Sequence, residues 1–266
     1  MSLIEQAARR LEELRRSGIE VPGAVPQPLS PVPEVKAEPE RVGPGVVRGI
    51  ASRTPTTGRR SRQVEIDLAH LASQGYLTPD SPRARIADEF RIMKRPLVSN
   101  IQAAQGTAAS RNALIMVTSA LPGEGKTFVS INLAISLASE LDSTVMLVDA
   151  DVARPSVLQR LGLPSAPGLL DLLTDSSLGM SDVLLRTNIE KLTLLPAGRP
   201  HGRATELLAS DAMNRLLDEL ARRYPDRILV FDAPPLLPST ESRVLATQMG
   251  QVVFVVDLVF PTVVLV

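Results

Sequence analysis

Five short apolar runs recur along the second half of the chain, and segments with helical spacing separate them. Continuous runs of Val, Ile and Leu of this length are typical of strands that are buried on both faces of a parallel sheet. The pattern predicts intervening helices over 127–141 and 205–223. This alternation predicts a doubly wound, mostly parallel α/β sheet. The predicted strands are 114–118, 144–148, 192–195, 228–231 and 252–256.

The first 62 residues carry a different pattern. Apolar residues recur every three or four positions over 2–18, which predicts an amphipathic helix within an N-terminal segment, 1–21. Eight of the chain's 22 prolines then fall between Pro22 and Pro55, where no helical or strand periodicity is present. Five arginines and no acidic residue lie between 46 and 64. We therefore expect 22–62 to be a disordered linker rich in proline and arginine.

Residues 63–112 are expected to form a helical lead-in to the core. The spacing predicts helices over 65–73 and 83–94, and Pro96 is expected to end the second helix. The lead-in and the α/β core, 113–266, together make one predicted domain, 63–266.

The composition excludes several classes of site. The 266 residues include no cysteine and only two histidines, which excludes disulfide scaffolds, iron–sulfur clusters and multi-histidine metal centres. The 29 basic residues equal the 29 acidic ones, so no overall basic field favours nucleic acid as a partner. No uncharged apolar run reaches the roughly 18 residues of a membrane span, and the charged N-terminus is unlike a signal peptide. We expect a cytoplasmic protein.

A glycine-rich loop follows the first predicted strand and precedes a helix. Its sequence, SALPGEGKT over 119–127, fits the Walker A pattern G-x-x-x-x-G-K-[ST], except that Ala120 takes the first glycine position. The glycines let backbone N–H groups converge on phosphate oxygens, Lys126 can reach the β- and γ-phosphates, and the Thr127 hydroxyl suits Mg²⁺. The predicted nucleotide-binding residues are Pro122, Gly123, Glu124, Gly125, Lys126, Thr127 and Phe128.

Aspartates follow two of the predicted strands. Asp149 and Asp151 come after the second strand, and Asp232 comes after the fourth, within an Asp-Ala-Pro-Pro sequence. The carboxyl ends of parallel strands share the ligand-binding edge of such a sheet, so these side chains should face the phosphate loop. Carboxylates there can ligate Mg²⁺ or accept a proton from a hydroxyl nucleophile, although a lone aspartate at a strand end is often a helix cap.

Together these three motifs resemble those of the bacterial tyrosine autokinases, P-loop kinases that regulate capsule and exopolysaccharide export. The resemblance covers roughly 63–257. The Ala-Arg-Pro sequence over 153–155, the N-terminal helix and the proline-rich linker are most similar to the exosortase-associated branch. The resemblance implies a P-loop NTPase fold similar to that of the partition ATPases. It also implies ATP and Mg²⁺ as cofactors, a homo-oligomer, phosphorylation of tyrosines on neighbouring copies, and a membrane chain-length-determinant protein as activator, which would hold the kinase at the inner membrane.

The resemblance also implies roles for individual residues. Lys126, Asp149 and Asp151 would be catalytic, with Asp149 as the candidate base, although the sequence alone does not separate the roles of the two aspartates. Thr127, Asp151 and Asp232 would organise Mg²⁺. A charged motif on the helix before the core, which helps such kinases to assemble, corresponds here to Asp88, Arg91 and Lys94.

The chain also departs from the family pattern. The arginine expected two residues after Asp151 is replaced by Ala153, and the available guanidinium is that of Arg154. Family chains continue past the fifth strand into a further helix, a strand and a tyrosine-rich tail. Here 258–266 supply only an irregular apolar segment, and the sequence contains two tyrosines, Tyr76 and Tyr224. We therefore expect a truncated C-terminus.

Two other functions remain open at this point. One is a P-loop ATPase switch of the partition type, but those proteins carry an extra lysine at the position of Leu121. The other is a truncated nucleotide-binding interaction partner without kinase activity.

Overall fold

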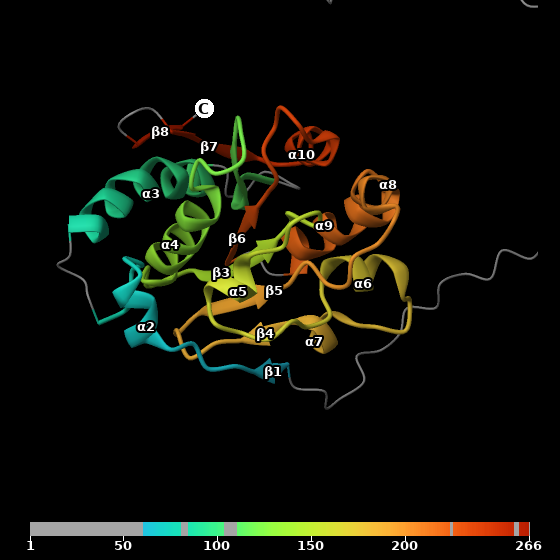
Figure 1. Cartoon of the computed structure of the whole chain (residues 1–266), viewed down its shortest axis with the longest axis horizontal. Coiled ribbons are helices and arrows are strands. Elements are labelled where there is room, and N and C mark those ends of the chain that lie inside the picture. The colour runs from blue at the N-terminus through green and yellow to red at the C-terminus, as the bar shows by residue number, and fades with distance from the viewer. Residues whose placement is uncertain (1–60, 81–84, 104–110, 224–225, 258–260, 266) are drawn as a thin grey trace, which may run out of the picture. The chain divides into compact units, whose positions relative to one another are not determined.

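An eight-stranded sheet forms the centre of the part of the chain that the structure describes (Figure 1). The structure is a computed structural model, and it describes residues 61–80, 85–103, 111–223, 226–257 and 261–265. The predicted N-terminal helix and nearly all of the linker lie outside these residues. The strand order is β1-β4-β5-β3-β6-β2-β7-β8, and only the β4–β5 and β7–β8 pairs are antiparallel. The doubly wound, mostly parallel sheet is thereby confirmed.

The five strands predicted from the apolar runs are all present, within one residue of the expected ends. Three strands were not predicted. Strands β1 and β4 have only two residues each, and β8 lies in the segment expected to be irregular. Residues 261–265 of that segment instead pair antiparallel with the fifth predicted strand. The strands are β1 (Arg62–Gln63), β2 (Leu114–Ser119), β3 (Thr144–Asp149), β4 (Leu185–Arg186), β5 (Leu192–Leu195), β6 (Arg227–Asp232), β7 (Gln251–Asp257) and β8 (Pro261–Leu265).

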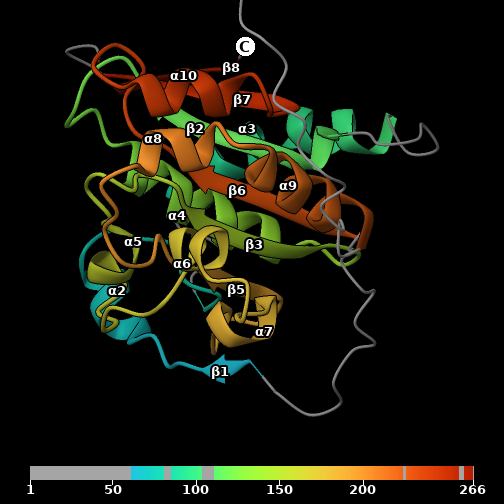
Figure 2. The ribbon, with the colours of Figure 1, turned by 90° about the vertical axis from the view of Figure 1, so that its right-hand side faces the viewer.

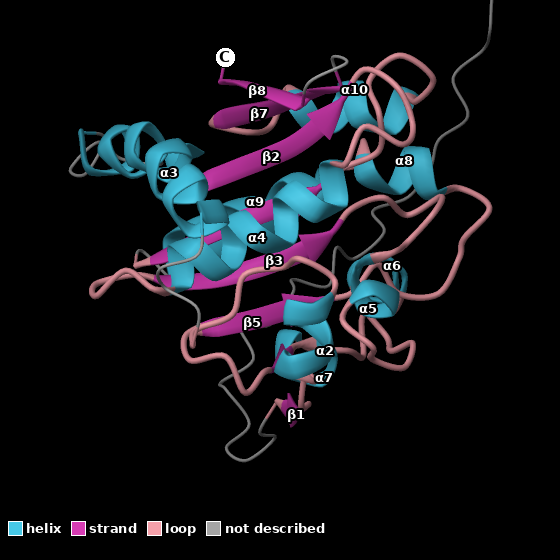
Figure 3. Ribbon diagram, turned by 60° about the vertical axis from the view of Figure 1, so that its left-hand side comes forward, coloured by secondary structure: helices cyan, strands magenta, loops and turns pink. Residues whose placement is uncertain are grey.

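Helices cover both faces of the sheet (Figures 2 and 3). Figure 3 shows α3 and α4 on one face, and Figure 2 shows α6, α8, α9 and α10 on the other. None of the helices in the described ranges is long and apolar enough to cross a bilayer. The helices are α2 (Leu68–Ser73), α3 (Arg85–Ala103), the short 3₁₀ helix η1 (Arg111–Ala113), α4 (Lys126–Ala138), α5 (Val157–Arg160), α6 (Leu169–Thr174), α7 (Met180–Val183), α8 (Ala204–Leu208), α9 (Asp211–Arg223) and α10 (Thr240–Ala246).

Alternate residues of the central strands supply two separate cores. Along β2, Ile115 and Val117 belong to the cluster that packs under α3 and α4, whereas Leu114 and Met116 belong to the cluster under α8, α9 and α10. All four are fully buried. Successive side chains of a strand point to opposite faces, so a strand with helices on both sides must be apolar at every position. This requirement explains the continuous apolar runs in the sequence.

Two predicted helices differ most from the structure, because tertiary contacts outweigh local signals. The helices predicted over 65–73 and 127–141 agree to within three residues, since α2 begins at Leu68 and α4 ends at Ala138. Helix α3 continues past Pro96 to Ala103. Proline removes one backbone hydrogen bond, but Phe90 and Leu97 anchor the helix in the core on either side of it. The helix expected over 205–223 is instead two helices, because α8 ends at Leu208 and the Ser210 hydroxyl accepts the Met213 N–H at 3.3 Å near the start of α9. Thr205 on α8 contacts Glu241 on α10.

Lys94, one of the three residues predicted to support oligomerisation, is buried inside the protomer. Its ammonium donates to the Ser136 carbonyl at 2.6 Å and pairs with the Glu140 carboxylate at 2.6 Å. Lys94 therefore ties α3 to the end of α4. The other two predicted residues, Asp88 and Arg91, pair with each other along the exposed side of α3. Their role in oligomerisation stays a prediction.

We predict that Lys94→Met lowers the free energy of unfolding by about 2 kcal/mol, because it leaves the buried Ser136 carbonyl without its charged donor and Glu140 without its partner. Urea denaturation followed by circular dichroism measures this. Arg95→Met is the matched control, since Arg95 is the exposed neighbour on the same helix and its loss should change the free energy by less than about 0.5 kcal/mol. Equal effects of the two substitutions would show that the Lys94 contacts do not stabilise the fold.

Candidate nucleotide site

The loop between β2 and α4 has the backbone geometry that the glycines were expected to provide. Gly123 and Gly125 have φ angles of 94° and 89°, in the left-handed region that favours glycine. Side chains of the loop brace it from within: the Glu124 carboxylate accepts the Leu121 N–H at 2.6 Å, and the Ser119 hydroxyl donates to the Leu121 carbonyl at 2.8 Å. The turn directs the chain into α4, whose N-terminus then faces the ligand-binding edge of the sheet.

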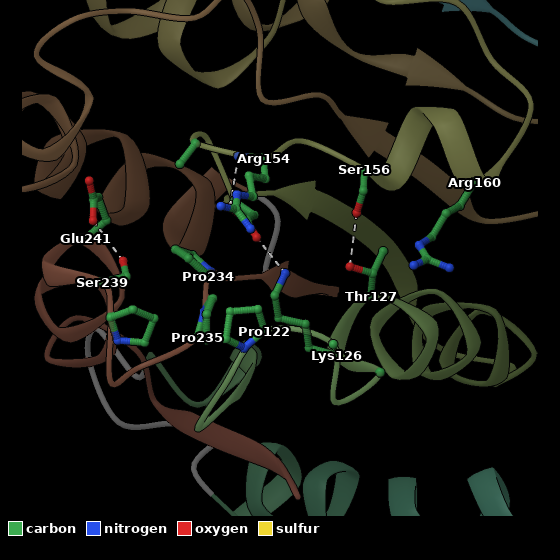
Figure 4. Close-up of a pocket in the computed structure, with 15 residues that line it drawn as sticks. Pro122, Lys126, Thr127, Arg154, Ser156, Arg160, Pro234, Pro235, Ser239 and Glu241 are labelled. Carbon is green, nitrogen blue, oxygen red and sulfur yellow. Dashed lines mark hydrogen bonds and ion pairs between the residues drawn. The ribbon is translucent and has the colours of Figure 1, made fainter. Parts of the chain in front are cut away.

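A cavity of about 530 Å³ opens at this loop (Figure 4). Its walls are formed by residues of the loop, of the segment after β3 and of the segment after β6. A nucleotide-sized ligand fits a cavity of this volume. The lining residues are Pro122, Gly123, Gly125, Lys126, Thr127, Asp151, Ala153, Arg154, Ser156, Arg160, Pro234, Pro235, Pro238, Ser239 and Glu241.

Lys126 and Asp151 form an ion pair at the centre of this cavity. The Lys126 ammonium lies 2.6 Å from the Asp151 carboxylate, and both side chains are almost fully buried. Beside them the Thr127 hydroxyl lies 3.1 Å from the Ser156 hydroxyl. The structure thus brings Lys126, Thr127 and Asp151 together in the cavity, and Asp232 lies close enough for the Lys126 charge and the Thr127 hydroxyl to act on its pKa.

The other two aspartates lie next to each other beneath the cavity. Asp149 and Asp232 are register partners at the ends of β3 and β6, and both are buried. Burial, together with the negative charge of Asp232, raises the pKa of Asp149 to about 7, against the lowering effect of the Val157 N–H. Burial also raises the pKa of Asp232, and the charge of Lys126 opposes that rise. One oxygen of Asp232 accepts the Ser130 hydroxyl at 2.9 Å.

Asp149 has a structural role in addition to any chemical one. Its Oδ2 accepts the N–H groups of Ser156 and Val157, at 3.1 and 3.0 Å, and so caps the start of α5. Its side chain borders a second cavity of about 350 Å³, lined mostly by apolar residues, and does not line the phosphate-loop cavity. Of the three aspartates, only Asp151 lines the cavity that holds Lys126.

Comparison with known proteins shows which proteins this chain resembles in sequence and in fold. No protein-family model matches the chain. The protein EpsB of Ralstonia nicotianae, which is assigned as a tyrosine-protein kinase, is 36% identical over 198 residues, which are 72% of this chain and 25% of EpsB. The tyrosine-protein kinase YwqD of Bacillus subtilis is 29% identical over 66% of this chain and 70% of its own length. The solved kinase domain of VpsO is 32% identical with a TM-score of 0.51, and the alignment covers 63% of this chain and 83% of that domain.

The chain belongs to the family of bacterial tyrosine-protein kinases. A solved chimerical protein, CapA2B2, has a similar fold, with a TM-score of 0.56 and 27% identity over 73% of this chain. The chain spans only about a quarter of EpsB, so the activity of that whole protein is not transferred by the similarity. Membership of the exosortase-associated branch stays a prediction.

Two predicted nucleotide-binding residues of this kinase-family loop do not line the cavity. The Glu124 side chain turns back to the loop backbone, as described above. The Phe128 ring packs against the Tyr76 ring, with centroids 4.9 Å apart and planes inclined at 47°. Their side chains therefore support the loop, and only their backbone groups remain available for a phosphate.

Sequence reasoning missed several residues of the site. Ser130 reaches Asp232 from the next turn of α4, while Ser156, Arg160 and Glu241 line the cavity itself. The Thr205 hydroxyl, 2.5 Å from Glu241, holds the pKa of that carboxyl below its usual range. Only Ser156 had a local signal, because it follows Pro155 at a position typical of a helix start.

The oxygen atoms at the site fit a magnesium ion that arrives with a nucleotide. Mg²⁺ is usually bound through one or two carboxylates and substrate phosphates, without a complete protein cage. Asp151 and Thr127 offer oxygens in the cavity, and Oδ2 of the buried Asp232 has no hydrogen-bond partner among the described residues. Within those residues no group of three or more His, Cys, Asp or Glu side chains is placed to hold a metal ion alone.

We predict that Asp149 makes the protein less stable as the pH rises from about 4 to about 7. The pKa of this carboxyl is about 7 in the folded state against 3.8 ordinarily, so the folded protein retains a proton that the unfolded chain has already released. The free energy of unfolding therefore falls across this window, by up to about 4 kcal/mol for a shift of this size. Asp149→Asn should be more stable than wild type at pH 8, with the difference closing toward pH 4.

Urea denaturation at half-unit pH steps, without nucleotide or Mg²⁺, measures the effect. Asp142→Asn is the control, because Asp142 is exposed and its loss should leave the pH profile unchanged. If the wild-type and Asp149→Asn profiles run parallel, the carboxyl is ionised throughout and the assigned pKa is wrong.

Proposed function

We propose that this protein is an ATP- and Mg²⁺-dependent protein-tyrosine kinase that phosphorylates tyrosines on neighbouring copies and regulates exopolysaccharide polymerisation and export. The observation that carries the proposal is the ion pair of Lys126 with Asp151, 2.6 Å apart, in the cavity at the phosphate loop. Phosphoryl transfer depends mainly on positioning and on stabilisation of charge. The cavity supplies a cation, Lys126, for the phosphates and a carboxylate, Asp151, for a metal ion.

Each charged residue has a distinct part in the proposed reaction. Bound Mg²⁺ would supply positive charge to the phosphates, and Thr127, Asp151 and Asp232 would hold it. The Lys126 ammonium would leave Asp151 and contact the phosphates, so the ion pair keeps the lysine in place until nucleotide binds. Asp149 is the candidate base, since an oxygen of its carboxyl, Oδ1, is buried without a partner among the described residues and its pKa lies near 7.

The position of Tyr76 makes it a poor acceptor tyrosine. Tyr76 is only 5% exposed, and its hydroxyl accepts a hydrogen bond from Arg160 at 3.2 Å. A kinase cannot transfer phosphate to this oxygen without opening the core. Tyr224 lies outside the described residues. Tyr76 is therefore not expected to be the acceptor on any copy, whereas Tyr224 stays a candidate.

The lengths of the relatives support a separate membrane protein as the activator. The matching segment makes up 22% of the succinoglycan biosynthesis transport protein ExoP of Rhizobium meliloti, at 33% identity, but 74% of CapB of Staphylococcus aureus. The same domain thus occurs both within long proteins and as most of a short one. By analogy we propose a membrane chain-length-determinant protein as the activator, holding a homo-oligomer of this kinase at the cytoplasmic face of the inner membrane.

We predict that Lys126→Arg abolishes phosphate transfer to tyrosine while the fold is retained. Arginine keeps a positive charge beside Asp151, so no buried carboxylate is left unpaired, but its planar guanidinium does not reproduce the point charge of an ammonium. The loss of activity should be at least about a hundredfold, as for other charge-stabilising groups. The assay follows radiolabelled phosphate from ATP to a tyrosine-containing polypeptide and, separately, into solution as free phosphate.

The assay also separates the proposed kinase from the two other functions. Lys191→Arg is the matched control, because this lysine donates to carbonyls far from the cavity, and it should retain full activity. Release of phosphate without tyrosine labelling would indicate the ATPase switch. Binding of ATP without either product would indicate a nucleotide-binding interaction partner, and both results would overturn the kinase proposal.

A further inference from the structure

Arg160 lines the phosphate-loop cavity at the end where Thr127 lies, and no motif predicted it. It is the last residue of α5, one helical turn after Ser156, whose hydroxyl contacts the Thr127 hydroxyl. Figure 4 shows the Arg160 side chain extending from α5 toward Thr127. Thr127 is the residue expected beside the terminal phosphates and their metal ion. The Arg160 guanidinium therefore lies in the part of the cavity where the terminal phosphates of a nucleotide would bind.

The Arg160 guanidinium is held by a neutral partner. Its Nη1 donates to the Tyr76 hydroxyl at 3.2 Å, and it forms no ion pair with any residue that the structure describes. Among the other charged side chains of the cavity, those of Lys126, Asp151 and Glu241 have partners of their own, whereas that of Arg154 has none among the described residues. Lys126 pairs with Asp151, and Glu241 accepts hydroxyl groups from Thr205 and Ser239. Arg160 therefore keeps its charge available for an anionic ligand.

Tyr76 is a rigid support for this guanidinium. The Leu77 N–H donates to the Asn132 side chain on α4 at 2.7 Å, and the Asn132 amide in turn donates to the Phe128 carbonyl. The Tyr76 ring packs on the Phe128 ring, two residues after Lys126. The tyrosine is thus fixed to the same helix that carries the phosphate loop. A guanidinium anchored in this way loses little conformational entropy when it binds a phosphate.

The start of α5 is fixed as well. Asp149 caps it through the Ser156 and Val157 N–H groups, and the Arg160 N–H donates to the Ser156 carbonyl at 3.0 Å. The start of the short helix is therefore tied to the site, and an intrahelical hydrogen bond joins Arg160 to that start. By contrast, Arg154 lines the same cavity, and among the described residues only its backbone N–H is hydrogen-bonded, to Asp151 Oδ1 at 3.1 Å.

We propose that Arg160 is a phosphate-contacting residue of the nucleotide site and that Tyr76 is the positioning residue that holds its guanidinium in place. This inference rests on the proposed nucleotide-binding function and extends it to two residues outside the phosphate-loop motif. Arginine can offer two parallel N–H groups to a phosphate, and a charge-assisted contact of this kind strengthens binding substantially.

The test measures dissociation constants of the full chain by calorimetry, with Mg²⁺, for ATP and for inorganic tripolyphosphate. Arg160→Gln should weaken both ligands by about tenfold or more, and by similar factors, because the contact is to phosphate and not to the base or sugar. Arg160→Lys should restore part of the affinity, since it keeps the charge without the paired donors. Arg186→Gln, at an exposed arginine on strand β4, is the matched control and should change neither constant.

A double-mutant cycle tests the role of Tyr76. Tyr76→Phe keeps the ring packing on Phe128 and removes only the hydroxyl, so it should weaken ATP binding by about threefold in the wild-type background. In the Arg160→Gln background it should have no further effect. A purely structural contribution of the hydroxyl would weaken binding equally in both backgrounds and would overturn the positioning role.

Other outcomes distinguish this inference from the proposed function. If wild type binds ATP, Lys126→Arg weakens it and Arg160→Gln does not, the inference about Arg160 is wrong while the nucleotide site stands. Weakened ATP binding with unchanged tripolyphosphate binding would place Arg160 at the base or sugar and would also overturn it. If wild type binds neither ligand, both proposals fail. Thermal unfolding of each variant identifies any that do not fold, in which case Arg160→Lys and Tyr76→Phe decide the result.

Discussion

The parallel pairing of β2, β6 and β3 brings three strand ends to one edge of the sheet, and the whole candidate site is built from that edge. Val117 of β2 lies opposite Asp232 of β6, and Asp232 lies opposite Asp149 of β3. The phosphate loop begins at the end of β2, directly above these carboxylates. A shift of register by one residue would turn the aspartates to the opposite face of the sheet, so the site depends on the pairing that the buried apolar runs impose.

This arrangement places negative charges close together in a buried environment, at a cost in stability. Asp149 and Asp232 both have raised pKa values, for which burial is the main cause. The charge of Lys126 and the hydroxyl of Ser130 offset part of this cost for Asp232. Bound Mg²⁺ would relieve the remaining repulsion, so the ligand-free protein is expected to be the less stable state. Ligand binding is therefore expected to raise the free energy of unfolding, because it removes the repulsion between the buried carboxylates.

The short helix α5 links the chemical and structural parts of the site. Its start is capped by Asp149, and its end carries Arg160, whose side chain reaches the Tyr76 hydroxyl in the helical lead-in. The lead-in is further tied to α4 by Leu77 and by the Lys94 contacts to Ser136 and Glu140. The segment before the core therefore does more than cover the sheet, because it fixes the helix that follows the phosphate loop.

The sequence by itself determined the class of fold, the phosphate loop and the strand-end aspartates. It could do so because burial on both faces demands continuous apolar strands, and because the left-handed backbone at Gly123 and Gly125 favours glycine. Only the tertiary structure decided which of the aspartates meets Lys126, that Lys94 is buried, and that Pro96 lies within a helix. It also placed Arg160 in the cavity beside a tyrosine 84 positions earlier in the chain. Such contacts join residues far apart in sequence, and they depend on the packing of whole elements, for which no local pattern carries a signal.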